Sequence, residues 1–169
     1  DIANTHGNTA VGMMSYAKGT GNYNTVVGGF AGSSTEDTTT AMSGDSNTVM
    51  GYNAGYTLTT GHSNVLIGRD SGKAMTGGRY NIAIGKEALD AHTIGDGNIA
   101  IGNRALGAQA VNQLGGSITD GTVNSIAIGR DALILQNNAD AINLAIGYNA
   151  GSAITSGTEN VLIGQEAGM

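Results

Sequence analysis

The chain has 169 residues and a formal net charge of −6, with only seven lysines and arginines, which argues against nucleic acids and anionic membranes as partners. Six tyrosines, one phenylalanine, no tryptophan and 29 glycines can fill only a thin core, and the absence of cysteine excludes disulfides and thiolate metal sites. No stretch approaches the ~18 apolar residues of a membrane span, so we expect no membrane insertion by this segment.

The pattern Asn-x-x-(Ile/Val)-Gly returns nine times along the chain, with small variations. Six of the eight separations between its glycines are 16 to 18 residues, so the underlying period is 17. A fixed period of this size indicates stacked copies of a unit too small to bury its own apolar face. The sequence therefore predicts one all-β domain over 1–169, a parallel β-solenoid (β-roll) of about nine 17-residue rungs. The glycines, called anchoring glycines below, are Gly12, Gly28, Gly51, Gly68, Gly85, Gly102, Gly129, Gly147 and Gly164.

Each unit is expected to place a strand directly ahead of its anchoring glycine, and a second short strand later in the unit. In chain order the first set covers 9–11, 25–27, 48–50, 65–67, 82–84, 99–101, 126–128, 144–146 and 161–163. The first and last residues of these strands, called the outer columns, share one face because side chains alternate along a strand. We predict that this face lines the solenoid core.

The middle residue of each strand must point the other way, yet it is always apolar. A strand that is apolar on both faces needs a second covering surface. We therefore predict that this middle column faces partner chains, and its small side chains favour a parallel bundle, specifically a homotrimer. The middle column is Ala10, Val26, Val49, Leu66, Ala83, Ala100, Ala127, Ala145 and Leu162.

An asparagine stands three residues after a corner glycine in nearly every unit, and Asn124 is displaced by one position. Asparagine can hold a left-handed corner and can hydrogen-bond to its own copy in the next unit, so a structural ladder is predicted. Calcium binding would require more carboxylates. The ladder residues are Asn8, Asn24, Asn47, Asn64, Asn81, Asn98, Asn143 and Asn160.

Two long spacings, from Gly28 to Gly51 and from Gly102 to Gly129, interrupt the period. They place loop inserts near 33–40 and 107–116. Stacking does not require these segments, and binding often lies in loops on a rigid scaffold, although tolerated surface decoration is the alternative. The candidate binding residues are Ser33, Ser34, Thr35, Glu36, Asp37, Gln109, Asn112 and Gln113.

Residues that suggest chemistry have structural explanations in the repeat. His92 replaces Leu or Met of an apolar column, which indicates a packed imidazole, and Arg69 should lie diagonal to Glu87 in a charge ladder. The string Gly95-Asp96-Gly97-Asn98-Ile99-Ala100 matches a dinucleotide pattern but lies inside a repeat unit with no helix after it. We expect no enzymatic activity, no catalytic residues, no metal site and no cofactor.

The string Asn124-Ser125-Ile126-Ala127-Ile128-Gly129 resembles the head repeat of trimeric autotransporter adhesins. Residues Asn143 to Ala150 resemble repeats of phage tail fibres and related surface proteins. The resemblance implies parallel homotrimeric β-rolls that bind host cells or matrix. It suggests a fibre or adhesin segment that is extracellular, on a cell surface or on a virion, with a cell-surface glycan or matrix as partner.

Two other functions fit parts of the pattern. A subunit of an extracellular filament without a receptor would have the same repeat. An ice-binding protein would use the short threonine ladder of Thr59, Thr76 and Thr93, although the inserts interrupt the flat array that ice binding requires. No polar capping segment follows the last unit, so we expect either a segment of a longer fibre or a subunit that abuts another protein.

Overall fold

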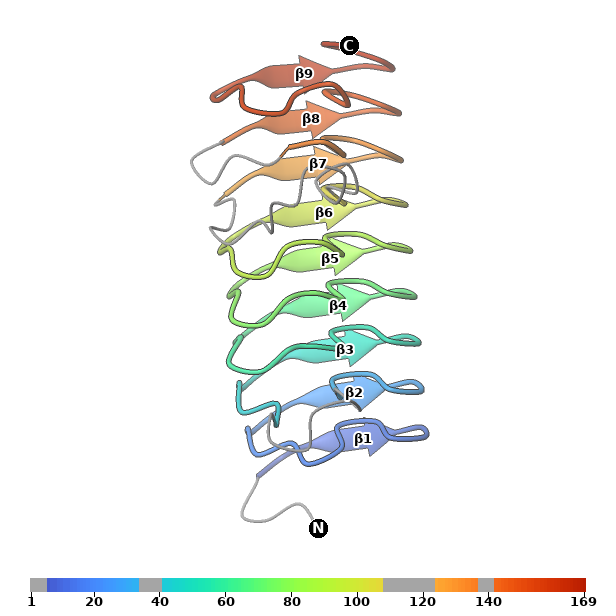
Figure 1. Cartoon of the computed structure of the whole chain (residues 1–169), viewed down its shortest axis with the longest axis vertical. Coiled ribbons are helices and arrows are strands. Elements are labelled where there is room, and N and C mark those ends of the chain that lie inside the picture. The colour runs from blue at the N-terminus through green and yellow to red at the C-terminus, as the bar shows by residue number, and fades with distance from the viewer. Residues whose placement is uncertain (1–5, 34–40, 108–123, 137–141) are drawn as a thin grey trace.

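The computed structural model describes residues 6–33, 41–107, 124–136 and 142–169, and within these ranges it contains no helix. Nine parallel strands pair in sequence order in a single sheet, stacked along one axis from β1 to β9 (Figure 1). The chain is thus an all-β parallel solenoid, as predicted. The strands are β1 (Thr9–Val11), β2 (Thr25–Val27), β3 (Thr48–Met50), β4 (Val65–Ile67), β5 (Ile82–Ile84), β6 (Ile99–Ile101), β7 (Ile126–Ile128), β8 (Leu144–Ile146) and β9 (Val161–Ile163).

Each strand ends at an anchoring glycine because no other residue fits there. Gly68 has φ of +131°, and a Cβ at this position would lie 2.5 Å from the carbonyl oxygen of Gly85 in the next coil. The stacked glycines therefore allow the backbones to approach closely while the chain turns away from the sheet. The strand register is kept throughout, and Leu66 pairs with Ala83 and then Ala83 with Ala100.

The predicted second strand of each unit is wrong for the described residues. The N–H groups of Thr59, Thr60 and Gly61 all donate to the single carbonyl of Thr76, at 3.0, 2.9 and 3.2 Å. A strand would present these groups to alternate partners. The backbone is instead strongly curved here, and outside the nine strands the pairing is one isolated bridge between Arg79 and Asp96.

The interior of the solenoid is filled by the middle column, which corrects the predicted orientation of the strands. Its residues from Val26 to Ala145 are fully buried within the single chain, whereas Ala10 is exposed and Leu162 half-buried at the two ends. They pack against small residues across the coil, such as Ala88, and against Leu58 and Met75. The middle column therefore belongs to the core of one chain and does not face partner chains. Both faces of each strand are apolar, so alternation alone could not decide which face lies inside.

Packing inside the coil follows a rule of large against small. Where the middle column has Ala83, the residue four positions after the anchoring glycine is Leu89, and both are fully buried. Where the middle column has Leu66, that position is Gly72, at which a Cβ would lie 2.9 Å from Leu66 Cδ2. In these coils either side can therefore fill the interior. The coil of Ala145 departs from the rule, because its residue at that position is Gly151, where a Cβ would lie 2.8 Å from Leu133 Cδ2 and 2.9 Å from Leu162 Cδ1.

Candidate functional site

The outer columns form an open apolar surface along the whole sheet, called the sheet face below. None of its residues is buried in the chain, and Ile84, Ile146 and Ile163 are 37%, 36% and 66% exposed. The sheet face, and not the middle column as predicted, is therefore the surface that lacks a covering layer. Its residues are Thr9, Val11, Thr25, Val27, Thr48, Met50, Val65, Ile67, Ile82, Ile84, Ile99, Ile101, Ile126, Ile128, Leu144, Ile146, Val161 and Ile163.

Asparagines form a hydrogen-bonded ladder at the entrance to the strands. The backbone N–H and the side-chain Nδ2 of Asn81 both donate to Asn64 Oδ1, at 3.0 and 3.1 Å. Asn81 Nδ2 also donates to the carbonyl of Gly95, at 2.7 Å. The residue in the left-handed conformation is the one just ahead of the ladder, such as Tyr80 with φ of 58°. The ladder asparagine thus satisfies buried polar groups of three corners at once, which is a structural role.

The ladder is interrupted at Ser125, and a second residue repairs it. Asn124 occupies the left-handed corner, with φ of 58°, so Ser125 takes the ladder position. Gln136 Nε2 donates to Ser125 Oγ at 2.9 Å, and Asn143 Nδ2 donates to Gln136 Oε1 at 2.8 Å. Sequence reasoning missed Gln136. A signal was present in the sequence, because two columns change together here. Ser125 replaces the ladder asparagine, and Gln136 takes the apolar position that Leu58 and His92 occupy in other units.

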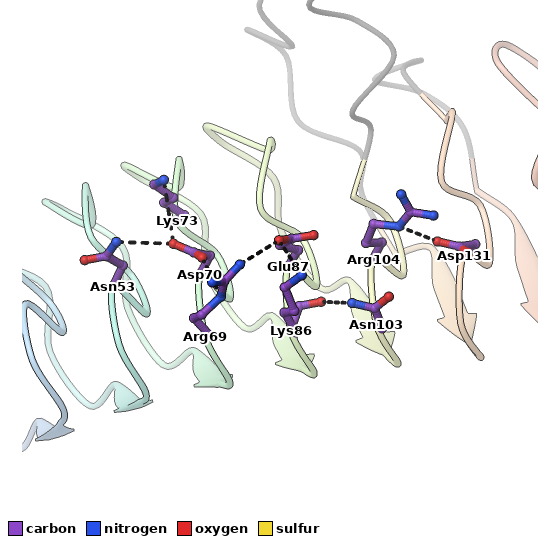
Figure 2. A network of polar contacts seen from close by, with 9 residues as sticks. All are labelled: Asn53, Arg69, Asp70, Lys73, Lys86, Glu87, Asn103, Arg104 and Asp131. Carbon is purple, nitrogen blue, oxygen red and sulfur yellow. Dashed lines mark hydrogen bonds and ion pairs between the residues drawn. The ribbon is translucent and has the colours of Figure 1, made fainter.

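Charged residues gather where the chain leaves the strands, on what we call the charged corner (Figure 2). It comprises the two residues after each anchoring glycine between Gly68 and Gly147, together with Lys73 and Asp90. Backbone hydrogen bonds between neighbouring coils fix the spacing of the charged corner. The N–H of Glu87 donates to the carbonyl of Arg69 at 2.9 Å, and the N–H of Arg104 donates to the carbonyl of Lys86 at 3.0 Å. Copies of each position therefore stack one strand spacing apart, about 4.8 Å.

Ion pairs along the charged corner link neighbouring coils. Arg69 Nη2 lies 3.2 Å from Glu87 Oε1, which confirms the diagonal pair predicted from the sequence. Arg104 Nε lies 2.6 Å from Asp131 Oδ1 in the next coil, and the hydrogen bond that Arg104 donates to Asp131 raises the pKa of Arg104. Arg130 contacts the same carboxylate at 3.2 Å and lies over the Tyr148 ring, 5.6 Å from its centroid.

His92 is packed in the core, as its column predicted. It is 1% exposed, and neither ring nitrogen has a hydrogen bond of normal geometry to the described residues. Burial lowers the pKa of His92 from 6.5 to about 4, and the nearby backbone of Leu106 offsets part of that shift. The imidazole is therefore neutral at physiological pH and acts as a space-filling group.

The threonine ladder has its hydroxyl groups directed at the backbone. Thr59 Oγ1 donates to the carbonyl of Thr76, and Thr76 Oγ1 to that of Thr93, both at 3.0 Å. These hydroxyl hydrogens are used within the protein, which leaves them unable to donate to an ordered layer of water. The arrangement counts against an ice-binding surface here.

The predicted binding loops lie almost wholly outside the described residues. This holds for Ser34, Thr35, Glu36, Asp37, Gln109, Asn112 and Gln113. Ser33 is described and is only 3% exposed, so it does not present its side chain for binding, contrary to the expectation. It packs inside the coil because it follows the buried Ala31 and Gly32 at the turn.

Within the described ranges, no group of three or more histidine, aspartate or glutamate side chains is placed to hold a metal ion. The same part of the chain has no helix with the length and apolarity needed to cross a membrane. Comparisons with protein-family models, with curated proteins and with solved structures find no match to this chain. The geometry of the sheet face and the charged corner therefore carries the functional argument.

Proposed function

We propose that this chain is a segment of a non-enzymatic surface fibre in which copies of the solenoid associate through the sheet face into a rigid rod. The supporting observation is that the sheet face is apolar and open while the interior of the coil is already filled. Parallel sheets are normally covered on both faces. The apolar surface continues along nine strands, and a continuous exposed apolar surface is typical of an interaction site.

The composition of the sheet face favours a parallel, in-register arrangement of copies. The first residues of β1 to β3 are Thr9, Thr25 and Thr48, whereas those of β4 to β9 are aliphatic. Parallel packing in register places threonine beside threonine and aliphatic beside aliphatic. An antiparallel pair would place the threonine hydroxyls against Ile and Leu, which costs free energy because those hydroxyls lose solvent without gaining partners.

Three copies are favoured by the resemblance of the repeats to trimeric adhesin heads and phage tail fibres. The same resemblance supports a location outside the cell, on a cell surface or on a virion. In this proposal the inserts near 33–40 and 107–116 project from the rod and contact a cell-surface glycan or matrix component. The rod itself supplies spacing and stiffness and requires no cofactor.

The oligomer is tested by placing charge on the sheet face. We expect Ile84→Asp with Ile146→Asp to reduce the mass measured by light scattering from that of a trimer to that of a monomer, since each carboxylate would be buried against other chains. The circular dichroism spectrum should keep its β signal, because both side chains point away from the core. The molar mass is measured by light scattering at the same micromolar concentration for each protein.

Two further variants control this experiment. Thr60→Asp adds the same charge at an exposed position away from the sheet face and should leave the oligomer unchanged. Ala100→Asp places the charge in the filled interior and should unfold the chain altogether. A folded wild-type monomer at micromolar concentration, or a trimer that persists in the double variant, contradicts the proposal.

A further inference from the structure

The charged corner carries most of the positive charge of an acidic protein. Five of the seven lysines and arginines lie there, namely Arg69, Lys73, Lys86, Arg104 and Arg130. With Asp70, Glu87, Asp90 and Asp131 the corner sums to five minus four, or +1. The rest of the chain sums to −7, since the total is −6. Five of the nine carboxylates in that remainder lie outside the described residues. The described part of the remainder, Lys18 and Arg79 against Asp45, Asp96, Glu159 and Glu166, sums to two minus four, or −2. Among the described residues, positive charge is therefore concentrated on the charged corner.

The positive groups of the corner are also those that reach solvent. The cationic side chains in ion pairs are between 33% and 59% exposed, whereas the carboxylates of Asp70, Glu87 and Asp131 are between 7% and 16% exposed. The carboxylates lie behind the cations and hold them in position. The charged groups of these ion pairs that reach solvent most are therefore guanidinium and ammonium groups. Because exposed ion pairs are individually weak, ligand anions can compete for these groups.

One row within the corner consists of the first residue after each anchoring glycine and has an aromatic ring at either end. The residues directly after the anchoring glycines of β3 to β8 are Tyr52, Arg69, Lys86, Asn103, Arg130 and Tyr148. Tyr52 is 54% and Tyr148 41% exposed, and Arg130 lies over one face of the Tyr148 ring. The row follows the stacking axis, with its members one strand spacing apart, about 4.8 Å.

We propose that this row binds a linear acidic polysaccharide, with its carboxylate or sulfate groups on Arg69, Lys86 and Arg130 and its sugar rings against Tyr52 and Tyr148. This inference rests on the proposed surface fibre and names a ligand class for it. Arginine offers planar donors that match carboxylate and sulfate groups, and tyrosine offers an apolar ring with a polar edge. A single file of cations fits one extended polymer.

Nucleic acid fits the same surface less well. A duplex carries charge on a broad cylinder, and a single row of cations could contact only a small part of its phosphates. A single polysaccharide chain can place its charged groups along the row. The distinction is part of the test.

The test uses the assembled protein and measures binding by isothermal titration calorimetry. The probes are a uronate oligosaccharide, a sulfated oligosaccharide, a neutral dextran oligosaccharide and double-stranded DNA of similar length. We expect wild-type protein to bind one of the acidic sugars, with an affinity that falls as salt rises, and to bind the neutral sugar and the DNA at least about tenfold more weakly. Binding of DNA with equal affinity would show a general polyanion surface and would overturn the proposal.

Variants locate the site. Arg69→Gln with Lys86→Gln and Arg130→Gln should weaken binding by about tenfold or more and flatten its salt dependence. Tyr52→Ala with Tyr148→Ala should weaken binding while leaving the salt dependence unchanged, which charge alone would not produce. Arg79→Gln is the matched control because it removes one exposed cation away from the corner, and it should change affinity by less than about twofold.

Two outcomes separate this inference from the proposed fibre. Light scattering on every variant reports the oligomer independently of binding, so a monomer that still binds the acidic sugar would contradict the fibre alone. A trimer that binds neither acidic sugar, or whose binding falls equally in Arg79→Gln, would overturn the polysaccharide site and leave the fibre proposal in place.

Discussion

The residue four positions after the anchoring glycine contributes to the filling of the coil interior. Leu89, Leu106 and Leu133 face alanines of the middle column, whereas Gly72 faces Leu66. Leu89 adopts a left-handed φ of 55°, a conformation that costs a non-glycine residue roughly 1 kcal/mol. Burial of the leucine side chain offsets that cost.

This reciprocity predicts strong coupling between Leu66 and Gly72. Leu66→Ala should cost about 3 kcal/mol of unfolding free energy because it opens a cavity. Gly72→Leu alone should also destabilise, since even its Cβ would lie 2.9 Å from Leu66 Cδ2. The double variant reproduces the pair found at Ala83 and Leu89, so it should recover at least about 1.5 kcal/mol relative to the sum of the single losses. The free energies of unfolding of the wild type, the single variants and the double variant are measured by denaturation at one fixed protein concentration. Additive losses would contradict the packing rule.

His92 predicts how stability depends on pH. Its pKa is about 4 in the folded chain and 6.5 when unfolded, so the unfolded chain binds the additional proton between these values. The contribution of His92 to the free energy of unfolding should therefore be constant above pH 6.5 and should fall as pH is lowered from 6.5 to 4. The total loss is about 3 kcal/mol.

The variant His92→Met isolates this contribution, because Met75 occupies the same position one coil earlier. The difference in unfolding free energy between variant and wild type should grow from pH 7.5 to pH 4.5. Other titrating groups are common to both proteins and cancel. A difference that stays constant over this range would show that His92 is solvated or paired in solution.

At the scale of the element, the sequence was sufficient for the strands and insufficient for their orientation. The period and the aliphatic-glycine boundary predicted all nine strand positions, because only glycine permits the turn that follows. Alternation predicted that the middle column opposes the outer columns. It could not decide which lies inside, since both are apolar and the usual contrast between polar and apolar faces is missing.

A second pattern in the sequence carried the missing information. Leu66 occurs with Gly72 and Ala83 with Leu89, and such exchange of volume is expected only between residues that share an interior. The asparagine ladder was predictable because its spacing is regular. The repair by Gln136 depends on a side chain crossing the coil, so no local spacing could show it.

The charged corner was predictable in part. Sequence spacing gave the pair of Arg69 and Glu87, because stacked positions one strand spacing apart bring diagonal neighbours into contact. It did not indicate that the cations would be exposed and the carboxylates shielded. The shielded carboxylates Asp70, Glu87 and Asp131 all occupy the left-handed second position after the anchoring glycine, a position that is also taken by Arg104.

At the scale of the whole molecule, the rod separates stability from recognition. Each coil bonds only to its neighbours, through the sheet, the ladder and the corner, so stability accumulates along the axis. The period itself requires 17 residues for each coil. The spacings of 23 and 27 residues leave six and ten additional residues, after subtracting 17, near 33–40 and 107–116.

Trimming both inserts to the 17-residue period should leave the melting temperature nearly unchanged, because a shorter connection alters closure entropy by only about 0.6 kcal/mol per halving of its length. In the proposed fibre, the same change should abolish attachment to cells or matrix, measured as binding of the labelled protein to a surface. Gln136 remains in the trimmed chain, so its buried hydrogen bonds with Ser125 and Asn143 are kept as an internal control. Attachment that survives trimming and is lost in the Arg69, Lys86 and Arg130 variant would move recognition from the inserts to the charged corner. Attachment that survives both changes would show that neither surface is the point of contact.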